Sequence, residues 1–390
     1  FSNMEGGMEI NLNKIKENDI IKILFAENPG IVIQVKDKDK AEVKKILEDA
    51  GIGYVKLGTP TDERHILVTK EDATYQFGID YLRDVWYSTS YLLDRKQSMN
   101  GCAKKRFENY KEQPLEFVFD KSFTGKFSQY GITPERRTPT GIKAAIIREK
   151  GTNGEREMAY MLYLAGFDVK DVTMTDLISG RETLEDINMI VFCGGFSNSD
   201  VLGSAKGWAG AFLFNPKAKA ALDNFYARKD TLSLGVCNGC QLMIELGLIN
   251  PEHNKKAKML HNDSHKFESK FVGVTVPMNR SVMLGSLSGS KLGIWVAHGE
   301  GKFSLPYEED KYNVVLKYSY DEYPGNPNGS DYSVAGLASS DGRHLAMMPH
   351  LERSCFPWQN AYYPSDRINK DQVTPWIEAF VNARKWVEMN

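Results

Sequence analysis

The pattern of apolar and polar positions changes at about residue 141. Before that point, short apolar runs that read as strands lie at 31–35, 54–57 and 66–69. Apolar residues at three- and four-residue intervals predict helices at 40–50 and 79–97. Residues 98–140 are charged, contain proline and show no clear period. This part therefore predicts a small α/β unit followed by a linker.

From Gly141 onwards, strand and helix patterns alternate. Apolar runs at 142–147, 189–192 and 232–236 read as strands, and helical spacing follows them. Asn215 before Pro216 is typical of a helix N-terminus, with a capping side chain and a proline at the first position. Further strands are expected at 271–276, 293–297, 313–318 and 344–348, before a last helix that starts near Thr374. This alternation predicts an α/β fold with a mostly parallel, doubly wound sheet.

Composition narrows the class of protein. A chain of 390 residues with 42% apolar side chains can bury a sizeable core in more than one domain. The net charge of −2 gives no reason to expect nucleic acid or a membrane as a partner. The five cysteines are odd in number and scattered, which is typical of a reducing cytoplasm.

The segment around Cys237 carries the clearest chemical signal. Cys237 lies between Gly235 and Gly239, after a predicted strand and before a helical pattern. A sharp strand-to-helix turn leaves little room for Cβ atoms, and the helix N-terminus favours negative charge on the sulfur. We therefore expect a reactive nucleophile, although a chance match around an inert cysteine would give the same letters. Cys240 completes a C-x-x-C pair, but no second pair or suitably spaced histidine supports a metal site.

A cysteine nucleophile needs a partner for proton transfer, and His350 has the best surroundings of the seven histidines. It follows the predicted strand at 344–348, and in extended backbone Glu352 would face the same side and hold the imidazole tautomer. A lone histidine is more often a surface or core residue, so spacing alone does not settle its role. His298, in a glycine-rich turn after another predicted strand, is a candidate for lining the same site.

Three ordered motifs resemble the class I glutamine amidotransferases, which use a catalytic triad. They lie at 235–241, 193–208 and 348–360. More narrowly, the chain resembles the large single-chain phosphoribosylformylglycinamidine synthases of purine biosynthesis, because 24–35 and 82–91 are similar to the tail of their synthetase region. The resemblance implies a synthetase-like tail at 1–100, a linker at 101–140 and an amidotransferase domain at 141–390. It also implies that the chain, which begins at Phe1, is the end of a longer polypeptide.

The resemblance further implies roles for individual residues. Cys237, His350 and Glu352 would form the triad. Residues of the oxyanion and glutamine site would be Gly194, Gly195, Phe196, Asn238, Gln241, Asn262, Ser264 and Phe267. Glutamine and an upstream synthetase region would be the partners. No metal or cofactor is expected on this chain, whereas ATP and Mg²⁺ are implied for the full-length enzyme.

The chain departs from the family pattern at three places. Ser197-Asn198-Ser199-Asp200 replaces the usual continuation of the glycine-phenylalanine loop, and Leu351 replaces a proline. Ser269-Lys270 replaces a pair that usually carries arginine, next to the residues assigned to the glutamine site.

Two other functions remain open from the residues alone. A stand-alone cysteine hydrolase of γ-glutamyl substrates would use the same triad, but the synthetase-like residues 1–100 argue against it. A non-catalytic binding module is disfavoured because Cys237, His350 and Glu352 are all present.

Overall fold

The computed structural model describes residues 6–112 and 115–390, and the chain divides into two compact units, Phe1–Leu93 and Asp94–Asn390. Helix α3 (Ile79–Gln97) contains the boundary. Residues 101–140, expected to be a linker, belong to the second unit. Within them, Cys102 and Phe123 are buried, and Val118 pairs with Lys291 in an antiparallel bridge. The segment differs from a free linker because its apolar side chains pack on that unit.

The described part of the first unit contains a four-stranded sheet in the order β2-β1-β3-β4. Its strands are β1 (Gly7–Asn11), β2 (Gly58–Thr61), β3 (His65–Lys70) and β4 (Ala73–Gly78). Its helices are α1 (Ile20–Phe25), α2 (Lys40–Asp49) and the greater part of α3. The expected helix at 40–50 and the expected strand at 66–69 are confirmed as α2 and β3.

The expected strands at 31–35 and 54–57 are wrong, because both segments lack regular structure. Ile31, Val32 and Ile33 are exposed, and no neighbouring strand pairs with them within the described residues. A β-branched run becomes a strand only where a pairing edge and a buried face are available. In this unit the sheet consists of β1, β2, β3 and β4, which pair with one another.

The second unit is built around a sheet that has nine strands within the described residues. In spatial order these are β13 (Lys291–His298), β12 (Glu268–Thr275), β15 (Asn313–Tyr318), β16 (Val334–Ala338), β17 (His344–Met347), β10 (Leu232–Val236), β8 (Met189–Phe192), β5 (Lys143–Arg148) and β7 (Asp168–Thr173). The strands from β17 to β7 run parallel to one another, and those from β13 to β16 extend the sheet with antiparallel pairings. The predicted α/β class is confirmed.

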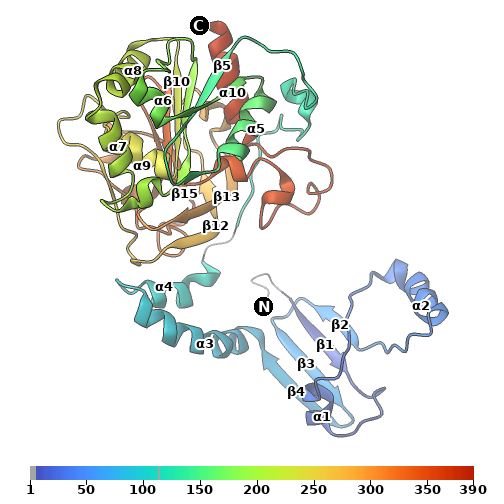
Figure 1. Ribbon diagram of the computed structural model, residues 1–390. Coiled ribbons are helices and arrows are strands. Elements are labelled where there is room, and N and C mark those ends of the chain that lie inside the picture. The colour runs from blue at the N-terminus through green and yellow to red at the C-terminus, as the bar shows by residue number, and fades with distance from the viewer. Residues whose placement is uncertain (1–5, 113–114) are drawn as a thin grey trace. The chain divides into compact units, whose positions relative to one another are not determined.

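Helices cover both faces of the parallel strands, as Figure 1 shows. Helices α5 (Glu155–Ala165) and α10 (Ile377–Met389) lie on one face. Helices α6 (Met174–Ser179), α7 (Lys206–Leu213), α8 (Pro216–Ala227) and α9 (Asn238–Glu245) lie on the other. Asn215 caps α8 by accepting from the amides of Lys217 and Ala218, as its sequence predicted. Among the described residues, no helix is long and apolar enough to cross a bilayer.

The register of the parallel strands brings three chain segments to one edge. Gly235 of β10 is level with Phe192 of β8, and Val236 is level with Met347 of β17. The residues that follow these strands therefore meet at the carboxyl edge of the sheet, where ligands bind in open α/β folds.

Two glycines allow the chain to turn sharply at this edge. A Cβ atom on Gly239 would lie 2.0 Å from the carbonyl oxygen of Phe192. One on Gly235 would lie 2.5 Å from the carbonyl oxygen of Gly239 and 2.6 Å from the sulfur of Met243. Helix α9 can pack this closely against β8 and β10 only because both side chains are absent.

We predict that Gly239→Ala destabilises the second unit. The added methyl group collides with the backbone of β8, so the helix must shift, at a cost of about 1–3 kcal/mol or more. The matched control is Gly210→Ala in α7, where a Cβ atom would meet only the ring of Phe214, at 3.8 Å. This control should be neutral or stabilising by about 0.5–1 kcal/mol. Equal unfolding free energies for the two variants in denaturant titrations would contradict the packing argument.

Candidate active site

Cys237 occupies the turn between β10 and α9 with φ 54° and ψ −108°. Positive φ is uncommon for a residue with a side chain, and such strain concentrates at functional sites. Its amide donates to the carbonyl of Met347 at 3.0 Å, and its thiol donates to the carbonyl of Ala297 at 3.5 Å. This is the strand–turn–helix geometry that presents a nucleophile at the edge of an α/β sheet.

His350 and Glu352 form a buried pair beside Cys237. Nδ1 of His350 is 2.7 Å from Oε1 of Glu352, and both side chains are almost completely buried. Residues 351–353 form a 3-10 turn, so the expected extended backbone is wrong although the expected contact is present. A Cβ atom on Gly194 would lie 2.9 Å from Cε1 of His350 and 3.4 Å from Cβ of Cys237, which places all three residues around one point.

The charge of His350 is set by two opposing effects. Burial disfavours the imidazolium, but the Glu352 carboxylate and the hydrogen bond with Cys237 outweigh it and raise the pKa of His350 from 6.5 to about 10. The partner carboxylate accepts at Nδ1, so Nε2 is the ring nitrogen left for Cys237.

The glycine-phenylalanine loop corrects one sequence expectation. Gly195 has φ 114° and pairs with Thr152, and a Cβ atom on it would lie 2.6 Å from the carbonyl oxygen of Gly151. The amide of Phe196 donates to that same carbonyl at 2.9 Å, so this donor is already used within the protein. Phe196 therefore does not offer an oxyanion donor here, whereas Gly194 lies next to Cys237.

Asn238 and Gln241 use their side chains to hold this loop and its neighbour. The Asn238 side chain accepts from the amide of Ser197 at 3.0 Å and donates to Gln241 at 3.0 Å. The Gln241 amide nitrogen donates to the carbonyl of Glu300 at 2.7 Å. Both residues are buried, and these hydrogen bonds make their side chains supports for the neighbouring loops.

Asn262 and Ser264 also have internal partners. The Asn262 amide donates to the carbonyls of Lys266 and His298, at 2.9 and 2.7 Å, and its oxygen accepts from the amide of Gly301 at 3.0 Å. Ser264 donates to Glu268 at 2.6 Å. Phe267, from the same loop, is half-exposed, and its ring centroid is 6.0 Å from that of Phe196.

His298 lies at the end of β13 and is buried. Burial, with a smaller effect of His350, lowers the pKa of His298 to about 3, so the ring is neutral at pH 7. Nδ1 lies 3.2 Å from the Asn262 side-chain oxygen and must carry the hydrogen, because that oxygen only accepts. Nε2 is then an acceptor, and it is buried without a partner among the described residues.

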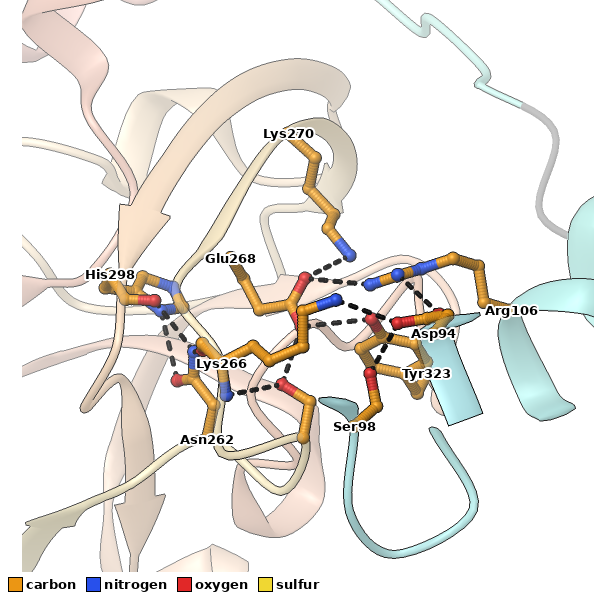
Figure 2. A network of polar contacts seen from close by, with 10 residues as sticks. Asp94, Ser98, Arg106, Asn262, Lys266, Glu268, Lys270, His298 and Tyr323 are labelled. Carbon is orange, nitrogen blue, oxygen red and sulfur yellow. Dashed lines mark hydrogen bonds and ion pairs between the residues drawn. The ribbon is translucent and has the colours of Figure 1, made fainter. Parts of the chain in front are cut away.

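Sequence reasoning missed the side chains that hold the Asn262 loop. Glu268, Lys266, Arg106 and Asp94 form a connected polar network behind it (Figure 2). Glu268 directly follows Phe267, but its partners at 94–106 are distant in the chain. Among the described residues, no group of three or more His, Cys, Asp or Glu side chains is arranged to hold a metal ion.

Comparison with known proteins agrees with this fold. Residues 141–387 match the family model of the CobB/CobQ-like glutamine amidotransferase domain. The chain therefore belongs to the family of glutamine amidotransferases that contain this domain.

Within that class, the relatives are specific. The chain is 39% identical to the phosphoribosylformylglycinamidine synthase of Homo sapiens, over 94% of this chain and 29% of that protein. It is 37% identical to the probable chloroplastic/mitochondrial phosphoribosylformylglycinamidine synthase of Arabidopsis thaliana, over 98% of this chain and 28% of that protein. A solved structure of PurLQS from Thermotoga maritima aligns with a TM-score of 0.49 and 27% identity, over 63% of this chain and 98% of that one. The resemblance stated from the motifs is confirmed, and the chain spans less than a third of the length of these two relatives.

We predict that iodoacetamide modifies Cys237 and not Cys240. Cys240 is fully buried, and burial raises the pKa of its thiol, whereas Cys237 lies at the edge of the sheet beside an imidazole. Peptide mass mapping after brief labelling should place the adduct on Cys237. Cys240→Ala should label like the parent and Cys237→Ala should not, and an adduct on Cys240 in the parent would sink the assignment.

We predict that the stabilisation by the His350–Glu352 pair declines as the pH rises. Below pH 6.5 the imidazole is protonated in the folded and the unfolded chain alike, so the contribution is complete. Between pH 6.5 and about 10 the folded chain binds the extra proton, so its stability falls with pH. The melting temperatures of the parent and of Glu352→Gln should therefore differ most near pH 6.5 and converge as the pH approaches about 10. A difference that grows with pH would contradict the raised pKa.

Proposed function

We propose that this chain is the glutaminase part of a phosphoribosylformylglycinamidine synthase. It would hydrolyse glutamine and supply ammonia for the ATP-dependent amidation of phosphoribosylformylglycinamide. The observation that carries the proposal is the convergence of Cys237, His350 and Glu352 at the carboxyl edge of the sheet. The identity to the human and plant relatives over almost the whole chain supports it.

The proposed chemistry begins with Cys237. His350, charged beside Glu352, stabilises the thiolate, which attacks the side-chain amide carbon of glutamine and forms a carbon–sulfur bond. The negative oxygen that develops is met by the backbone amide of Asn238, at the N-terminus of α9, and by the backbone of the loop at Gly194 and Gly195. The carbon–nitrogen bond then breaks while Nε2 of His350 gives its proton to the departing ammonia.

The second half of the reaction returns the enzyme to its first state. A water molecule gives a proton to the neutral His350 and attacks the glutamyl thioester, and the carbon–sulfur bond breaks. Glutamate and the thiolate–imidazolium pair result. Glu352 keeps its contact with Nδ1 throughout, which fixes the tautomer needed in both halves.

The rest of the proposed activity lies outside this chain. Ammonia would pass to an upstream synthetase region of the same polypeptide, where ATP and Mg²⁺ act, and we propose no cofactor on residues 1–390. The chain's five free cysteines are consistent with the cytoplasm as the proposed compartment.

We predict that the purified chain releases glutamate and ammonia from glutamine. Cys237→Ala and His350→Ala should each abolish measurable turnover, because the two groups act as one unit. Turnover would be followed by coupled detection of glutamate, with Cys240→Ala as the matched control that keeps activity. ATP, glutamine and phosphoribosylformylglycinamide together should give no amidated product with this chain alone.

Two results would contradict the proposal. Hydrolysis of γ-glutamyl peptides in preference to glutamine would indicate a stand-alone hydrolase. Turnover that survives Cys237→Ala would remove the nucleophile from the mechanism.

A further inference from the structure

A buried carboxylate lies behind the candidate glutamine site and has no part in the chemistry proposed above. Glu268 is at the start of β12, and its side chain is 3% exposed. Oε1 accepts from Ser264 at 2.6 Å and from the Tyr323 hydroxyl at 3.0 Å. Oε2 pairs with Lys270 at 2.7 Å and with Arg106 at 3.3 Å. Four donors thus meet one buried carboxylate (Figure 2).

On one side, Glu268 reaches the candidate site through the loop at 262–268. Ser264, which donates to Glu268, accepts from the amide of Lys266 at 3.3 Å. The carbonyl of Lys266 in turn accepts from Asn262, and Asn262 contacts both Nδ1 and the carbonyl of His298. The tautomer of His298, and with it the bare Nε2 acceptor, therefore depends on a loop that Glu268 holds.

On the other side, the same loop is tied to the segment at 94–106. Asp94 accepts from Arg106 at 2.7 Å and from Lys266 at 2.8 Å. Burial opposes its charge, but the hydrogen bonds from Lys266 and Ser98 outweigh burial and hold the pKa of Asp94 below its usual value. The amide of Met99 also donates to the carbonyl of Ser264 at 3.0 Å. Figure 2 shows these side chains converging between the helical segment and the loop.

The ion pairs of this network are costly to break. A carboxylate this deeply buried is tolerated because it is fully paired, and removing one partner leaves an uncompensated charge. The arrangement fixes one geometry of the loop rather than adding much net stability. That is the expected property of groups that support a binding site.

We propose that Glu268 is a positioning residue for glutamine binding. Held by Arg106, it keeps the Asn262–Ser264 loop and the His298 acceptor in the geometry that binds the substrate. The proposal rests on the proposed function, because that function makes glutamine the substrate and the family resemblance places Asn262, Ser264 and Phe267 at its site. It goes further by giving the binding geometry a dependence on Arg106 of α4 (Cys102–Glu108).

The test uses the 390-residue chain and a glutamine analogue that carries an electrophilic chloroketone. Its inactivation rate at several concentrations separates the half-saturation constant from the maximal rate, and iodoacetamide reports the reactivity of Cys237 without glutamine recognition. The variants are Arg106→Gln, Ser264→Ala and Glu268→Gln. The matched control is Lys105→Gln, because Lys105 is the neighbour of Arg106 on α4 and pairs with Glu322 at 3.1 Å instead of with the loop.

We expect Arg106→Gln, Ser264→Ala and Glu268→Gln each to raise the half-saturation constant by about tenfold or more, the effect of losing a hydrogen bond to a charged group. The maximal inactivation rate and the iodoacetamide rate should stay at the parent values, and Lys105→Gln should behave as the parent. Combining Ser264→Ala with Glu268→Gln should add little to the larger single effect, because both act through one contact.

The outcomes separate this inference from the proposed function. A parent that is labelled saturably, with variants that match it, would overturn the positioning role alone. If the variants lose both the maximal inactivation rate and the iodoacetamide rate, Glu268 has a merely structural role, and the positioning role is overturned as well. A parent whose Cys237 is not labelled saturably by the analogue would overturn the proposed function, and this inference with it. If Glu268→Gln does not fold, Arg106→Gln and Ser264→Ala decide the question.

Discussion

The candidate site depends on one close approach of backbone to backbone. Helix α9 begins so near to β8 that a methyl group on Gly239 would lie 2.0 Å from the Phe192 carbonyl. The turn that precedes this close contact holds Cys237 at a positive φ of 54°, which is uncommon for a residue with a side chain. The side chain of Cys237 then lies beside Gly194, two residues after the end of β8, and Gly194 in turn lies beside the ring of His350, which follows β17.

The electrostatics of the site follow from what each histidine faces. His350 faces the Glu352 carboxylate, and its pKa is raised to about 10. His298 faces the neutral amide of Asn262, and burial with the nearby His350 lowers its pKa to about 3. The site therefore holds one imidazolium and one neutral imidazole at pH 7. Two buried cations close together would repel each other. The carboxylate beside His350 stabilises its charged form, whereas the amide beside His298 carries no charge that would do so.

The sequence predicted the strands that are buried on both faces and missed features that depend on distant partners. The runs at 189–192 and 232–236 were predicted at the observed bounds, because strands in the middle of a parallel sheet are continuously apolar. The run at 31–35 is also mostly apolar, but no strand within the described residues pairs with it. Glu352 was paired with His350 correctly, but through a 3-10 turn. The use of the Phe196 amide by Gly151 leaves no trace in local sequence.

The side-chain amides at the site also show what the sequence alone could not predict. Motifs mark Asn238, Gln241 and Asn262 as residues of the glutamine site, yet each is buried and bonded within the protein. Burying an amide requires that its donors and acceptors be satisfied, so these residues fix the neighbouring loops instead of presenting free groups. The loops that they fix carry the groups proposed to bind glutamine. For that reason a residue such as Glu268, remote from the sulfur, can control how well a ligand fits beside it.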